Sequence, residues 1–90
     1  MYKLRFTESY QKRAKKFFQK HRDLMTQYEK VLQILCINPR HPSLRLHKLS
    51  GSMDGFSSVS INLSYRLILY FIVKDDIIVP INIGSHDEVY

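Results

Sequence analysis

Polar and apolar positions alternate at the beginning of the chain. Tyr2, Leu4 and Phe6 are separated by Lys3 and Arg5, and a period of two is the pattern of a half-buried strand. The sequence therefore predicts a first strand over residues 2–6.

Two segments with helical periodicity follow. Over residues 8–20 one apolar stripe faces a strongly basic surface, and Thr7 offers an N-cap hydroxyl. A second helix is predicted over 23–37, with Asp23 as its cap. The dipeptides Asn38-Pro39 and His41-Pro42 end it, because proline disfavours helical geometry in the residue before it. The stripe residues are Tyr10, Ala14, Phe17 and Phe18 in the first helix and Leu24, Tyr28, Val31, Leu32 and Leu35 in the second.

The rest of the chain predicts three strands. Residues 57–62 alternate, residues 65–73 are almost wholly apolar, and residues 77–83 contain Pro80, which lacks a ladder donor and indicates an edge or a bulge. The order βααβββ predicts an α+β fold, with two N-terminal helices packed on a small antiparallel sheet, in one domain over residues 1–90. We expect the first strand to lie beside the third or the last strand.

Charge is distributed unevenly along the chain. Residues 1–48 carry twelve Lys and Arg against three Asp and Glu, a formal charge of +9, whereas residues 49–90 carry −3. A basic excess of this kind favours a polyanionic partner, either nucleic acid or an acidic protein segment. A solubilising surface would have the same composition, so charge alone does not assign a function.

Several classes of protein are disfavoured. The single cysteine, Cys36, permits no intrachain disulfide, and no apolar run has the length of a leader or of a membrane span. The four histidines and Cys36 do not fall at zinc spacings, and no glycine-rich phosphate loop is present. We therefore expect a cytoplasmic protein with no metal, no cofactor and no membrane partner.

Three motifs resemble those of the RelE/ParE toxin superfamily, and of its YafQ-like branch in particular. His47-Lys48-Leu49-Ser50-Gly51 resembles an H-x-L-x-G signature after the second helix, and Tyr65-Arg66-Leu67-Ile68 is similar to a YRL central strand. Residues 83–90, IGSHDEVY, are similar to the closing segment of that branch. The order of elements and the length also fit, so the resemblance covers essentially the whole chain.

The resemblance implies a toxin of a type II toxin–antitoxin system. Its partners would be a cognate antitoxin, the ribosome and mRNA, which it would cleave as a metal-independent endoribonuclease. The alternative within the superfamily is a ParE-like inhibitor of DNA gyrase without nuclease activity. A third possibility is a degenerate homologue that binds only an antitoxin or operator DNA.

Such cleavage needs a base, an acid and cations for the phosphate. The resemblance implies catalytic roles for His47, Arg66, His86 and Tyr90, and RNA-backbone contacts for Arg45 and Lys48. His86 would serve as general acid or base, Arg66 would stabilise the scissile phosphate, and Tyr90 would stack on a base or assist proton transfer. His41 is expected to be a loop residue.

Other interpretations of these residues stay open. Arg66 could form a structural ion pair with Asp87 or Glu88, and His86 and Tyr90 could belong to a loose terminal tail. The strand over 57–60 carries serines where RelE-branch toxins have lysines. Ser60 and Asn62 stand where the YafQ-like branch has a further His and an Asp. Catalysis would thus depend on fewer groups.

Overall fold

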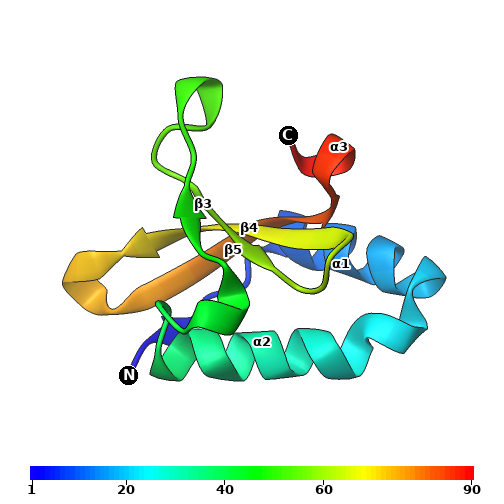
Figure 1. Cartoon of the computed structure of the whole chain (residues 1–90), viewed down its shortest axis with the longest axis horizontal. Coiled ribbons are helices and arrows are strands. Elements are labelled where there is room, and N and C mark those ends of the chain that lie inside the picture. The colour runs from blue at the N-terminus through cyan, green and yellow to red at the C-terminus, as the bar shows by residue number, and fades with distance from the viewer.

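The computed structural model describes residues 1–90 and has helices on both faces of a five-stranded sheet (Figure 1). None of the helices combines the length and the apolar character needed to cross a bilayer. In chain order the strands and α-helices are β1 (Lys3–Leu4), α1 (Glu8–Lys20), α2 (Met25–Ile37), β2 (His47–Lys48), β3 (Ser57–Ser60), β4 (Tyr65–Ile72), β5 (Ile77–Ser85) and α3 (His86–Val89).

The two long helices begin and end close to where their periodicity predicts. The Thr7 hydroxyl accepts a hydrogen bond of 3.2 Å from the Tyr10 N–H, which confirms the predicted cap of α1. The predicted cap Asp23 is wrong. An N-cap needs a non-helical backbone, whereas Asp23 lies inside a 3₁₀ turn, Arg22–Leu24, that joins the two helices. Helix α2 begins after this turn without a side-chain cap.

The sheet has the strand order β1-β5-β4-β3-β2. The first strand therefore lies beside the last, one of the two predicted neighbours. It pairs with β5 in parallel, so the expectation of a wholly antiparallel sheet is wrong at this edge, because periodicity carries no information on strand direction. Pro80 lies at a bulge: Ile68 pairs with Asn82 but Leu69 pairs with Pro80.

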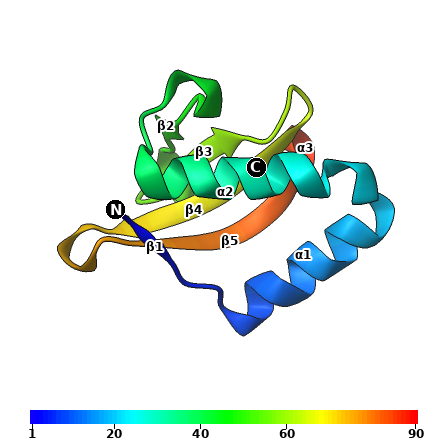
Figure 2. The ribbon, with the colours of Figure 1, turned by 90° about the horizontal axis from the view of Figure 1, so that it is seen from below.

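The two faces of the sheet differ in character. Helices α1 and α2 cover one face (Figure 2), and their apolar stripes meet Val59, Leu67 and Leu69 in the main hydrophobic core. Side chains alternate across a strand, so Arg66 and Ile68 belong to the opposite face. That face carries only the short helix α3 and the β2–β3 connection (Figure 1), which leaves room for a site.

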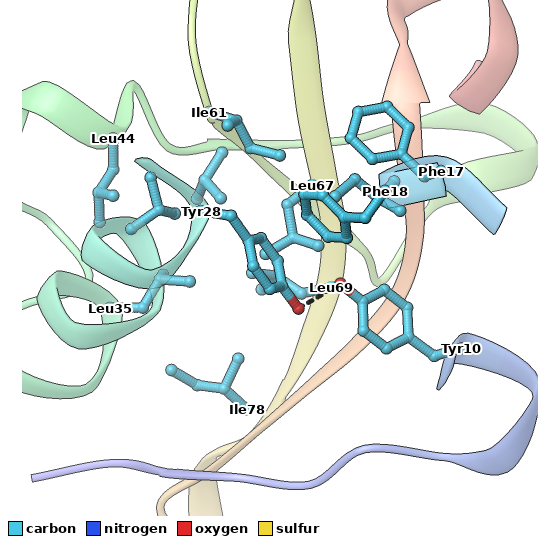
Figure 3. Packing of buried hydrophobic residues seen from close by; sticks show 13 residues of the cluster. Tyr10, Phe17, Phe18, Tyr28, Leu35, Leu44, Ile61, Leu67, Leu69 and Ile78 are labelled. Carbon is cyan, nitrogen blue, oxygen red and sulfur yellow. Dashed lines mark hydrogen bonds between the residues drawn. The ribbon is translucent and has the colours of Figure 1, made fainter. Parts of the chain in front are cut away.

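Two tyrosines are hydrogen-bonded to each other within the core (Figure 3). The Tyr10 and Tyr28 hydroxyl oxygens lie 2.7 Å apart, and both residues are buried. Burial raises the pKa of each hydroxyl above its ordinary value, so both stay neutral. The pair joins the beginning of α1 to the first half of α2.

Removing one of these two hydroxyls should destabilise the protein, because the other hydroxyl then stays buried without a hydrogen-bond partner. We expect Tyr10→Phe to lower the free energy of unfolding by about 1–2 kcal/mol, because Tyr28 then keeps a buried hydroxyl without its partner. The double variant Tyr10→Phe/Tyr28→Phe should cost less than the two single changes added together. Urea denaturation of the four proteins measures this, and additive losses would contradict it.

Candidate active site

Arg66 is the second residue of the middle strand β4 and lies on the face opposite the long helices. Its Nε donates to the Ser58 hydroxyl at 2.6 Å, and its Nη2 donates to the Arg45 carbonyl at 3.3 Å. The same Nη2 lies 3.5 Å from Nδ1 of His47. The only two ion pairs in the chain, Lys12–Glu8 and His86–Asp87, do not include Arg66. The structural ion pair considered for Arg66 is therefore absent, and its charge is free for an anion.

The C-terminal residues reach this group through the same serine. The Tyr90 hydroxyl donates to the Ser58 hydroxyl, and the Tyr90 ring packs edge-on against His86 with ring centroids 4.5 Å apart. Ser58 thus joins Arg66 to Tyr90, and His86 lies on the same side of the sheet through its contact with Tyr90. The sequence-based hypothesis depends on this arrangement, since side chains on opposite faces could not act on one phosphate.

Helix α3 is what brings the end of the chain back over the sheet. Ser85 and Glu88 form a capping box: the Glu88 carboxylate accepts from the Ser85 N–H at 2.8 Å, and the Glu88 N–H donates to the Ser85 hydroxyl. A Cβ at Gly84 would lie 3.0 Å from Glu88 Cβ, so glycine provides the space for this turn. Tyr90 is therefore anchored, whereas the His86 side chain is 74% exposed.

The hydrogen bonds to Glu88 make the attachment of α3 sensitive to acid. They lower the pKa of this carboxyl below its ordinary value, with the Ser85 backbone N–H as the main cause. Because this pKa is lowered, the stabilisation by these hydrogen bonds is complete above the ordinary carboxyl range. It is lost as pH falls through the lowered pKa. We expect the amide resonance of Ser85, which donates to this carboxylate, to shift over that acidic range. In Glu88→Gln, which keeps an acceptor but does not titrate, this shift should disappear.

Two of the predicted RNA-binding side chains lie apart from the cluster. Arg45 has a left-handed backbone (φ 48°) and gives its carbonyl to Arg66, while its side chain lines a separate hollow of about 230 Å³. Lys48 is the register partner of Ser57, and Ser57 pairs with core residue Leu69. Directly opposed residues share a face, so Lys48 is on the helix side of the sheet.

His41 behaves as the loop residue that was expected. Its Nδ1 accepts from the Ser43 N–H at 3.1 Å and lies 2.8 Å from the Ser43 hydroxyl. These local bonds cap the short 3₁₀ turn over Pro42–Leu44.

Ser58 is the site residue that sequence reasoning missed. It was considered only as part of a serine strand that lacks the charged residues of related toxins, yet its fully buried hydroxyl accepts from both Arg66 and Tyr90. Alternation places Ser58 and Ser60 on one face. Which of the two lies next to Arg66 Nε depends on the side-chain direction across the strands.

Replacing this hydroxyl should uncouple Arg66 from Tyr90. We expect Ser58→Ala to lower the rate of any reaction at the site by about tenfold or more, because misplaced groups lose orientation, with a stability loss of only about 1–2 kcal/mol. Ser60→Ala is the matched control: it removes a hydroxyl that donates to the Asn62 carbonyl at 2.6 Å and leaves Arg66 in place. Turnover and urea denaturation separate the two effects, and equal rates in both variants would contradict the role of Ser58.

The assembled groups define what the site can do chemically. A guanidinium without a carboxylate partner binds a phosphate, while an exposed imidazole beside a phenol can move protons. No three His, Cys, Asp or Glu side chains lie close enough together to share a metal ion. The guanidinium, the imidazole and the phenol are the groups available here for phosphate binding and proton transfer.

Fold and site together define a small toxin of the RelE/ParE superfamily. The model of the family described as "Bacterial toxin of type II toxin-antitoxin system, YafQ" matches residues 2–90. The chain belongs to this YafQ family of toxins.

Several solved structures have the same fold. YafQ from E. coli strain BL21(DE3) is 17% identical with a TM-score of 0.81, over 100% of this chain and 99% of that chain. A copper-bound mutant toxin from Helicobacter pylori is 28% identical with a TM-score of 0.79, over the whole of both chains. The E. coli DinJ–YafQ toxin–antitoxin complex is 20% identical with a TM-score of 0.78, over 99% and 97%. A search of curated proteins finds no match.

Proposed function

We propose that this toxin is a ribosome-dependent, metal-independent endoribonuclease that cleaves mRNA. The observation that carries the proposal is that the buried Ser58 hydroxyl accepts from both Arg66 and Tyr90. His86 packs on the Tyr90 ring, and His47 lies beside the guanidinium. The cluster lies on the sheet face that the long helices leave open (Figure 1). A strand of RNA can therefore approach it.

The reaction would proceed by attack of a ribose 2′-oxygen on the adjacent phosphorus. One histidine, His47 or His86, takes the 2′-hydroxyl proton as general base, and the other histidine protonates the leaving 5′-oxygen as general acid. The new 2′-O–P bond forms as the P–O5′ bond breaks, which leaves a 2′,3′-cyclic phosphate and a 5′-hydroxyl. Arg66 stabilises the charge on the phosphate oxygens, and Tyr90 assists proton transfer or stacks on a base.

The basic half of the chain supplies a second, weaker type of contact. Arg13, Lys16 and Lys20 lie on one side of α1 and line a cleft of about 350 Å³ beside the end of β5. We assign these side chains, with Arg45 and Lys48, to phosphates of ribosomal RNA and of mRNA outside the cleavage site. Such contacts make the affinity strongly dependent on salt.

A cognate antitoxin is the proposed protein partner, in the cytoplasm. The toxins in two related structures are bound by antitoxins, DinJ with YafQ and YefM with YoeB. An acidic or amphipathic antitoxin segment over the basic surface, or one that displaces Tyr90 from Ser58, would neutralise this chain.

Mapping of transcript 5′ ends after induction of the toxin tests the proposal. New ends within coding sequences, absent when translation initiation is blocked, are the expected result. Intact transcripts together with inhibition of DNA supercoiling by the purified protein would instead identify a gyrase inhibitor. Expression without a growth defect would contradict both toxic activities.

A further inference from the structure

A groove lies on the helix side of the sheet, on the opposite face from the Arg66 cluster and next to the edge strand β2. It has a volume of about 360 Å³ and runs between the N-terminal segment, the loop after α2 and the ends of β3 and β4. Ligand pockets in proteins commonly have about 300–1,000 Å³, so the groove is large enough for a small planar group. Nothing in the Arg66 cluster other than His47 contributes to it.

The walls of the groove are aromatic and cationic. Tyr2 packs edge-on against Phe71, with ring centroids 5.7 Å apart, and both rings are only partly buried. Leu46 extends the apolar surface, and Arg40 and Lys48 provide positive charge. No Asp or Glu lines the groove, and neither cation forms an ion pair. An aromatic surface beside unpaired cations suits a base with its phosphate.

The groove and the Arg66 cluster meet at the edge strand β2. His47 pairs with Ser58 and lies 3.5 Å from Arg66 Nη2, while its neighbour Lys48 faces the groove. β2 is the last strand of the sheet and has two residues, so its outer side has no strand partner. A single RNA strand held by Arg66 and His47 can turn around this free edge and place a neighbouring nucleotide in the groove.

We propose that this groove is a nucleobase subsite. It would take one base of the single-stranded RNA that lies next to the cleaved dinucleotide, with the base against Tyr2 and Phe71 and its phosphate near Lys48. The inference rests on the proposed function, because it assumes that the chain acts on RNA. It adds a site that would make the toxin prefer certain sequence positions around the cut.

Abasic scanning of a short RNA tests the subsite without cleavage. The probe is a fluorescent hexanucleotide with 2′-O-methyl groups throughout, which blocks attack by the 2′-oxygen, and one base is removed at a time. Base–aromatic stacking predicts that removal of one particular base weakens binding to the wild-type protein about tenfold. Phe71→Leu should weaken binding of the intact RNA to the same extent, and removal of that base should then have no further effect on binding.

Matched variants separate stacking and charge from misfolding. Phe56→Leu removes another partly exposed ring, one paired with Tyr70 and outside the groove, and should leave RNA affinity unchanged. Lys48→Gln should reduce the slope of log Kd against log salt by about 0.7, whereas Lys30→Gln on α2 should not change it. Thermal denaturation establishes that all four variants are folded.

The outcomes decide between distinct conclusions. An abasic effect of equal size in wild type and Phe71→Leu, or no binding of the RNA at all, overturns the subsite. Unchanged RNA affinity together with weaker binding of the cognate antitoxin would make the groove a protein-docking site and also refute the proposal. Position-dependent RNA binding in a toxin that leaves cellular transcripts intact would refute the endonuclease function and support the subsite.

Discussion

Replacement of His86 by alanine should abolish mRNA cleavage and growth arrest while the protein stays folded. The imidazole is 74% exposed and packs on Tyr90, so its loss removes a proton-transfer group and very little buried surface. General acid–base groups contribute about 10²–10⁴ to a rate, and we expect a loss in that range. Single-turnover cleavage of mRNA on programmed ribosomes measures it, with circular dichroism to monitor the fold.

His41 provides the control for this experiment. It is also an exposed histidine, but its ring interacts only with Ser43 in the loop after α2. His41→Ala removes the same kind of side chain and should retain nearly full cleavage. Full toxicity of His86→Ala would refute the assignment of His86. A loss of structure in this variant but not in His41→Ala would assign His86 to the stability of α3.

The long helices could be predicted closely because their signals are local. Thr7 and the apolar stripe determine where α1 begins, and proline after Asn38 determines where α2 ends. Asp23 misled the prediction since a good cap residue also suits a short 3₁₀ turn, and the choice depends on how the chain reverses after His21. Helix boundaries that follow from tertiary packing are not encoded in the periodicity.

Helix α3 was missed although its signal is present in the sequence. Ser85-His86-Asp87-Glu88 has the spacing of a capping box, and that spacing alone predicts a helix start. No helix was predicted for this segment, and a loose terminal tail stayed open as the alternative because terminal residues are often disordered. A helix so short is stable only through its contacts. Here these include the buried side chain of Val89 and the bond from Tyr90 to Ser58.

The site itself could be predicted in composition but only partly in geometry. Strand alternation placed Ser58 and Ser60 on one face, but the register sets Ser60 opposite Arg66, and only the direction of the Arg66 side chain brings its Nε to Ser58. Lys48 shows the same limit. It follows His47 in the chain, yet in an edge strand one residue separates the two faces of the sheet. Because His47 and Lys48 are neighbours in the sequence, their side chains were expected to lie together, but they lie on opposite faces of the sheet.

Arg66→Gln should reduce cleavage by about 10²–10³, the effect of removing one group that stabilises a transition state. No carboxylate pairs with the guanidinium, so its loss leaves no buried charge behind, and the thermal midpoint should change little. Arg66→Lys is the informative comparison. Lysine keeps the charge, but a single ammonium cannot bond Ser58 and the Arg45 carbonyl and also present a fork to phosphate.

We therefore expect Arg66→Lys to retain RNA affinity near the wild-type value and to lose most of the cleavage rate, whereas Arg66→Gln should lose both. This pattern separates charge from geometry. If lysine restores the full rate, then the positive charge alone is sufficient and the bonds through Ser58 do not orient the reacting groups. If glutamine retains the full rate, the phosphate does not bind at Arg66 and the endonuclease mechanism is wrong. Parallel measurements of Kd for an uncleavable RNA and of the single-turnover rate on ribosomes distinguish these cases.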